Sequence, residues 1–168
     1  MPDIILDTMV LGDFLAQYFD SAGVNRGLGV GRFMHGGTIT KNLSRKLNTF
    51  LCDGQEPLGS LVIASAFAFV ELARKWDLFV GGRFSMDQLH AFVDQPPDWF
   101  DIAPVDEDLL PFYVNVPGLV YLGGQHVPIE WTDAVHVATT LSRGHTALLA
   151  TTDRKIKAMN LFIHRVVS

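Results

Sequence analysis

The sequence predicts an α/β protein built around a parallel sheet. Short apolar runs, each of the length of a buried strand, alternate with longer stretches whose apolar residues recur at helical spacing. Two of the runs are soon followed by an acid, at Asp7 and at Asp153, as is typical where a buried strand emerges at the carboxyl edge of a sheet. Ligands of open α/β sheets bind at that edge. We therefore expect the functional residues there.

The composition is that of one compact domain spanning residues 1–168. Of these residues 48% are hydrophobic and 18% are charged, which is enough to bury a core and too apolar for a disordered chain. Cys52 is the only cysteine, and the short apolar run at the N-terminus is interrupted by Asp3 and Asp7. We therefore expect a cytoplasmic protein without a signal peptide. The apolar stretch 61–80 carries four charged residues, which argues against a membrane span.

Charge is unevenly distributed along the chain. The net charge is −5, yet the glycine-rich insertion at about 21–52 contains five basic residues and no acid. Two interpretations remain open: a basic arm that contacts a phosphate backbone, or a solvated loop without that role. The glycines of 21–37 match neither the dinucleotide-binding nor the P-loop spacing, so they predict a loop rather than a nucleotide site.

The first half of the chain is expected to contain two strands and three helices. Apolar positions recur at i, i+1, i+4 and i+5 after Asp7, which predicts an amphipathic helix. Ser65 is placed to cap the helix that follows the second strand. The expected strands are 4–6 and 61–64, and the expected helices are 10–19, 38–51 and 66–79.

The second half repeats the same alternation. Ser85 and Pro96 bound one helix, and Asp106 is placed as the N-cap of another. The segment 117–128 is expected to be a loop, and a hairpin that includes 119–122 is an alternative for part of it. The expected strands are 99–105, 147–150 and 161–167, and the expected helices are 86–93, 107–113, 129–141 and 154–159.

Four acids follow strands or begin helices in this scheme: Asp7, Glu71, Asp133 and Asp153. Asp133 interrupts an otherwise apolar helix surface, where burial of an unpaired carboxylate is costly. Glu71 has two interpretations, as a partner of Arg74 or Lys75 on its own helix or as an acid directed toward Asp7. Asp153 likewise could be only a helix cap. His136 is expected to be a hydrogen-bonded core residue rather than a metal ligand.

Convergence of these four carboxylates favours a divalent cation. Carboxylates within hydrogen-bonding range repel one another and retain protons unless a cation compensates them. Mg²⁺ and Mn²⁺ prefer oxygen ligands, whereas zinc prefers His and Cys, and one or two such ions could polarise a phosphodiester. Acyl transfer is not expected, because the chain has no G-x-S-x-G and Cys52 has no evident His partner.

Four short segments share a pattern of apolar residues, hydroxyls and acids. They are Ile5-Leu6-Asp7-Thr8, Phe69-Val70-Glu71-Leu72 preceded by Ser65, the segment 132–139, and Leu149-Ala150-Thr151-Thr152-Asp153. In this order they resemble the four motifs of the PIN domain family, and most closely those of the VapC-like toxin ribonucleases. The separation of the first two acids, 64 residues, exceeds the usual spacing in these toxins because of the glycine-rich basic insertion.

The resemblance implies a three-layer α/β/α sandwich around a parallel sheet of four to five strands, and an Mg²⁺- or Mn²⁺-dependent endoribonuclease. It implies the toxin of a toxin–antitoxin pair, with an RNA substrate, a homodimer and a small antitoxin as partner. The implied metal-binding residues are Asp7, Glu71, Asp133 and Asp153, and Thr8 and Thr151 take the positions of hydroxyls that hydrogen-bond the acidic cluster. Two alternatives stay open: a catalytically silent PIN-like module that binds RNA or protein, and a non-toxin RNA-processing nuclease.

Overall fold

The computed structural model describes residues 3–20, 37–53, 56–57, 61–159 and 166–167. Its centre is a five-stranded sheet with the order β5-β4-β1-β8-β9, in which all neighbouring strands are parallel. The strands are β1 (Ile4–Leu6), β4 (Val62–Ser65), β5 (Phe100–Ala103), β8 (Leu148–Ala150) and β9 (Val166–Val167). The predicted α/β class with a parallel sheet is confirmed. The expected glycine-rich loop at 21–36 and most of the expected last strand lie outside the described residues.

Strand β1 is central because its two neighbours come from distant parts of the chain. Ile5 lies beside Ile63 of β4 on one side and beside Leu149 of β8 on the other. Strands β1 and β4 are fully buried and β8 is buried except at Leu148, as expected for continuous apolar runs in a parallel sheet. Asp7 therefore leaves the sheet at the middle of its carboxyl edge, between β4 and β8.

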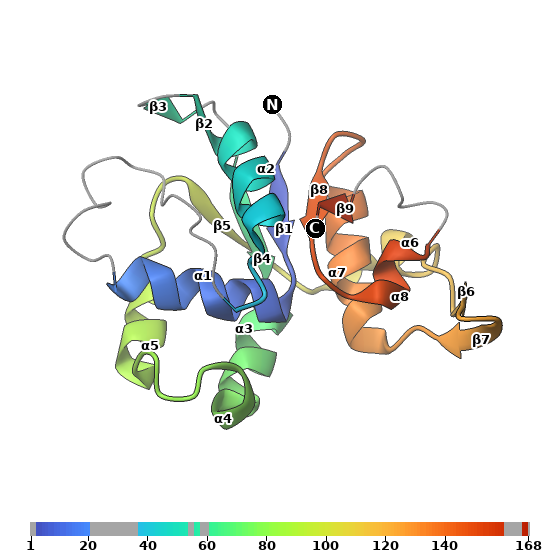
Figure 1. Cartoon of the computed structure of the whole chain (residues 1–168), viewed down its shortest axis with the longest axis horizontal. Coiled ribbons are helices and arrows are strands. Elements are labelled where there is room, and N and C mark those ends of the chain that lie inside the picture. The colour runs from blue at the N-terminus through green and yellow to red at the C-terminus, as the bar shows by residue number, and fades with distance from the viewer. Residues whose placement is uncertain (1–2, 21–36, 54–55, 58–60, 160–165, 168) are drawn as a thin grey trace.

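Helices cover both faces of the sheet, because successive strand residues point to opposite sides. Ile4 and Leu6 pack in one cluster with apolar residues of α1 (Thr8–Asp20), α3 (Ala66–Arg74) and α5 (Met86–Asp94). Ile5 packs in another with Val137 and Ile156, from α7 (Trp131–Ser142) and α8 (Arg154–Lys157). Figure 1 shows α1, α3 and α5 on one side of the strands and α7 and α8 on the other. This arrangement is compatible with a three-layer sandwich.

The remaining elements are short, apart from the basic helix α2 (Lys41–Leu51). They are α4 (Trp76–Phe79), the 3-10 helix η1 (Glu107–Leu109) with α6 (Leu110–Tyr113), and the hairpins β2 (Cys52–Asp53) with β3 (Glu56–Pro57) and β6 (Leu119–Leu122) with β7 (Gln125–Pro128). The helix expected over 66–79 is interrupted at Lys75, whose φ of −107° and ψ of 37° are not helical. The hairpin left open at 119–122 is present, and Gly123 and Gly124 supply the two positive φ angles of its turn. No helix in the described segments is long and apolar enough to cross a membrane.

A buried acid on α1, Asp13, links three parts of the fold. Its carboxylate accepts hydrogen bonds from the Thr38 backbone N–H, at 2.6 Å, and from the Thr38 hydroxyl, and it forms an ion pair with Arg83. Gly37 has a φ of +56°, and a Cβ there would lie only 2.5 Å from an Asp13 carboxylate oxygen. Asp13 thereby fixes the segment before α2 and the connection between α4 and α5 against α1.

Candidate active site

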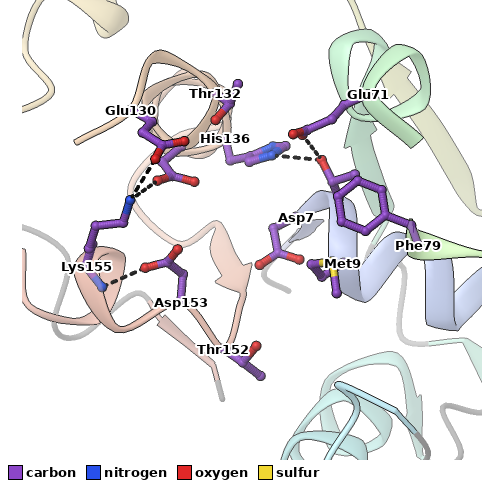
Figure 2. Close-up of a pocket in the computed structure, with 12 residues that line it drawn as sticks. Asp7, Met9, Glu71, Phe79, Glu130, Thr132, His136, Thr152, Asp153 and Lys155 are labelled. Atoms are coloured by element: carbon purple, nitrogen blue, oxygen red, sulfur yellow. Dashed lines mark hydrogen bonds and ion pairs between the residues drawn. The ribbon is translucent and has the colours of Figure 1, made fainter. Parts of the chain in front are cut away.

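The four predicted acids line one pocket of about 290 Å³ at the carboxyl edge of the sheet. Asp7 follows β1, Glu71 lies on the helix after β4, and Asp153 follows β8. Asp133 enters from the first turn of α7. Figure 2 shows Asp7 and Asp153 at the same pocket, with Lys155 on the other side of Asp153 from Asp7 and its ammonium directed at Glu130. The structure therefore brings together side chains that are up to 146 residues apart in the sequence.

Asp7 is the buried acid at the centre of the pocket. Its Oδ1 accepts the backbone N–H of Val10 at 2.8 Å, so it caps α1. Burial raises the pKa of Asp7 to about 6, and the charges of Asp153 and Asp133 add to the rise, while hydrogen bonds from Thr151 and Val10 oppose it. Asp7 therefore ionises less readily than an ordinary aspartate, and a nearby cation would favour its charged form.

Asp133 is close to a cation supplied by the chain itself. The Lys155 Nζ lies 3.3 Å from Asp133 Oδ2 and 3.6 Å from Glu130 Oε1. The pKa of Asp133 is nevertheless above its ordinary value, because burial and the charge of Asp153 outweigh the stabilisation by Lys155. Burial disfavours the charged form of Lys155, but its hydrogen bond with Asp133 and the surrounding acids raise its pKa overall. The ammonium is therefore firmly charged.

Asp153 is both a helix cap and a pocket residue. Its Oδ1 accepts the backbone N–H of Lys155 at 2.6 Å, and its own N–H donates to the Thr151 hydroxyl oxygen at 3.0 Å. The two interpretations of Asp153 are thus compatible, since capping uses one carboxylate oxygen and leaves the side chain at the pocket wall. Thr151 is fully buried and contacts both Asp7 and Asp153.

Glu71 makes the ion pair of its first interpretation, and its second, direction toward Asp7, is met only in that both acids line the same pocket. Lys75 Nζ lies 3.0 Å from Glu71 Oε1, and the Thr8 hydroxyl donates to Glu71 Oε2 at 2.6 Å. The acid therefore pairs on its own helix and reaches the pocket through Thr8. Thr8 and Thr151 each hydrogen-bond acids of the pocket, and their role in a catalytic site stays a prediction.

His136 is a buried hydrogen-bonded residue, as expected, although it also lines the pocket. Its Nε2 lies 3.2 Å from the Thr8 hydroxyl oxygen. Because Thr8 gives its proton to Glu71, the Nε2 must carry the proton of the imidazole. Burial lowers the pKa of His136 to about 4, so the ring is neutral at pH 7. Its Nδ1 has no hydrogen-bond partner among the described residues.

The acids of the pocket are of the type that binds a hard divalent cation. Their present arrangement suits such an ion less well. The acids offer only oxygen ligands, and a cation would offset the burial and the mutual repulsion that raise the pKa of Asp7 and Asp133. As the side chains stand, however, no group of three or more His, Cys, Asp or Glu residues in the described segments is gathered closely enough to hold an ion. Glu71 and Asp133 are each engaged by a lysine. Binding of a metal therefore requires these acids to reorient.

Sequence reasoning missed two charged residues of the pocket, Glu130 and Lys155. Lys155 lies only two residues after Asp153, and Glu130 directly precedes α7. Their positions beside predicted site residues are a signal that they belong to the pocket. In the sequence, however, a lysine of a short surface helix looks the same whether it lines a pocket or extends into solvent. The informative contact, Lys155 to Asp133, joins two separate helices and exists only in the fold.

Comparison of the chain with protein-family models, with curated proteins and with solved structures found no match. The resemblance to the PIN domain family therefore rests on the four sequence motifs.

Proposed function

We propose that this chain is a PIN-like endoribonuclease that depends on Mg²⁺ or Mn²⁺. The observation that carries the proposal is the convergence of Asp7, Asp133 and Asp153 on one pocket, where burial and mutual repulsion raise the pKa of Asp7 and of Asp133. Two of these acids also cap helices, but burying carboxylates beside one another costs stability that the caps alone do not explain. Perturbed acids that converge in a pocket are typical of functional sites.

The residues that would hold the ion are Asp7, Asp133 and Asp153, with Glu71 as a fourth oxygen ligand. When bound, a divalent ion supplies charge stabilisation to a phosphodiester and lowers the pKa of water. In the structure, hydrogen bonds within the chain hold three of these acids at the pocket. Val10 and Thr151 orient Asp7, Thr151 also supports Asp153, and Thr8 holds Glu71.

The four motifs further support the toxin of a toxin–antitoxin pair, acting as a homodimer and inhibited by a small antitoxin. A second candidate is a catalytically silent module that binds RNA or protein. The ion pair between Lys155 and Asp133 favours this second candidate, because it engages an acid that the nuclease would need for its metal.

Cleavage of labelled RNA separates the two candidates. Purified wild-type protein is incubated with tRNA and with unstructured single strands, in Mg²⁺ or Mn²⁺ and then in EDTA, beside Asp133→Asn. Asp101→Asn is the matched control, because Asp101 is a partly exposed acid of β5 that pairs with Arg143. We expect metal-dependent cleavage by the wild type and the control, and a loss of about 100-fold or more in Asp133→Asn.

Equal cleavage by Asp133→Asn, or cleavage that persists in EDTA, would contradict the metal-dependent nuclease. Binding of RNA by a folded wild-type protein without any cleavage would support the silent module instead.

A further inference from the structure

Lys155 is the one cationic side chain that lines the acidic pocket in the described part of the chain. Two contacts of its own segment hold Lys155 at the pocket. Its backbone N–H is fixed by Asp153, and the next residue, Ile156, is buried in the core beneath α8. Its side chain is 21% exposed. Lys155 is therefore not a freely solvated lysine, since its ammonium is directed at Asp133 and Glu130.

The two ion pairs of Lys155 differ in environment. The Asp133 side chain is 17% exposed, whereas that of Glu130 is 69% exposed. Pairs with an exposed acid contribute little, so the contact at 3.3 Å with Asp133 is the one that matters. The Lys155 ammonium compensates the charge of Asp133 on the α7–α8 side of the pocket. No basic side chain of the described residues compensates the charge of Asp7.

We propose that the Lys155 ammonium is a built-in cation that takes the place of a second metal ion, so that the pocket accepts one divalent ion and binds it more weakly than the acids alone would. This inference rests on the proposed metal-dependent function. The argument is electrostatic, because like charges a few ångströms apart repel one another much more strongly in a partly buried pocket than in bulk water. A divalent ion beside Asp133 would have to approach that ammonium, whereas no cationic side chain in the described lining of the pocket pairs with Asp7.

Binding of Mn²⁺, followed by the electron paramagnetic resonance of the free ion, tests the proposal without any measurement of catalysis. The variants are Lys155→Met, which removes the charge and keeps the length, and Lys155→Arg, which keeps the charge. Lys157→Met is the matched control, because it removes the same charge from the same helix at a residue that does not line the pocket. Ionic strength is held constant throughout.

We expect one Mn²⁺ per wild-type chain, and binding that is about tenfold or more tighter in Lys155→Met. Lys155→Arg and Lys157→Met should stay within about twofold of the wild type on the same electrostatic argument. Two ions in the wild type, or an affinity of Lys155→Met equal to that of Lys157→Met, would overturn the proposal. In either of those cases the metal-dependent function would stand. Absence of Mn²⁺ binding in all four proteins would overturn both.

Thermal unfolding provides a second measurement that tests the proposal even if Lys155→Met is poorly stable. Without a metal this variant leaves Asp133 partly buried and unpaired, so its Tm in EDTA should be below that of the wild type. Addition of Mn²⁺ should raise its Tm by more than it raises that of the wild type, because the ion replaces the missing charge. An equal rise in both proteins would mean that Lys155 has only a structural role.

Discussion

Asp7 and Asp13 are buried acids at the start and in the middle of the same helical segment, and their surroundings are opposite. Asp13 has a guanidinium, a hydroxyl and a backbone N–H as partners. Asp7 has hydrogen bonds from Val10 and Thr151 but no basic partner among the described residues, and it faces two further acids. Burial alone therefore does not distinguish an acid of the candidate site from a structural one. The distinction lies in whether the fold supplies the compensating charge.

The largest expected effect is at Asp13. Asp13→Asn removes the charge that Arg83 compensates and weakens the bonds to Thr38. Loss of one member of a buried pair typically costs 3–5 kcal/mol, and because the Arg83 side chain is 40% exposed and can be rehydrated, we expect about 3 kcal/mol. Urea unfolding at pH 7 measures the loss. An unchanged free energy of unfolding would show that Asp13 does not stabilise the fold and would contradict its contrast with Asp7.

The same substitution at Asp7 should have the opposite sign. An asparagine still caps α1 at Val10 and avoids the ionisation of a buried carboxyl whose pKa is raised to about 6 from 3.8. A rise of that size corresponds to at most about 3 kcal/mol at pH 7, so Asp7→Asn should be more stable than the wild type in EDTA. The proposed ribonuclease activity should be lost. Destabilisation of Asp7→Asn at pH 7 would show that Asp7 is structural, like Asp13.

The pH dependence of stability sharpens the contrast further. Between pH 3.8 and about 6, folded Asp7 keeps a proton that the unfolded chain has released, so Asp7 lowers stability as the pH rises. Between about pH 4 and 6.5, unfolded His136 binds a proton that the folded chain excludes, so His136 raises stability as the pH rises. The two contributions oppose each other in the wild type.

Asp7→Asn should therefore gain stability between about pH 4 and 6 more steeply than the wild type, by about 1.4 kcal/mol per pH unit. Urea unfolding at closely spaced pH values in EDTA measures the two slopes. Parallel slopes would mean that Asp7 ionises in the folded chain as readily as in the unfolded one.

The smallest expected effect concerns the glycine that contacts Asp13. Gly37 and Gly81 have nearly equal φ angles, +56° and +55°, but a Cβ meets Asp13 at the first and nothing within 4 Å at the second. Gly81→Ala should cost about 1 kcal/mol from its backbone conformation alone. Gly37→Ala should cost about 1–2 kcal/mol more, because the methyl group displaces the Asp13 carboxylate. Equal losses in thermal unfolding would show that the Asp13 cluster adapts without strain.

The sequence was sufficient to predict the elements whose signal is local. The runs that became β1, β4 and β8 are short, apolar and bounded by polar residues, so their strands and the acids that follow them could be identified. Ser65 and Ser85 were recognised as caps for the same reason, and both side chains accept the expected backbone N–H. The convergence of the four acids followed from placing parallel strands side by side.

Contacts between distant residues could not be predicted in this way. Arg83 pairs with Asp13 from 70 residues away, and Lys155 pairs with Asp133 from 22 residues away. A single sequence contains no signal that identifies the partner of a lysine or an arginine over such separations. The interruption of the helix at Lys75 was also missed, because the apolar spacing continues through it. Glu71 shows the limit most clearly: two local interpretations competed, and in the fold its carboxylate contacts Lys75 and Thr8.

The position of β1 between β4 and β8 has a consequence for the order in which the protein is made. During synthesis β1 and β4 emerge early and can pair, but the other flank of β1 stays open until residues 148–150 have been added. Asp153 and Lys155 follow immediately after that last central strand. An unfinished chain therefore holds Asp7 and Glu71 without the other wall of the pocket. Any activity that needs all four acids begins only once translation has passed residue 153.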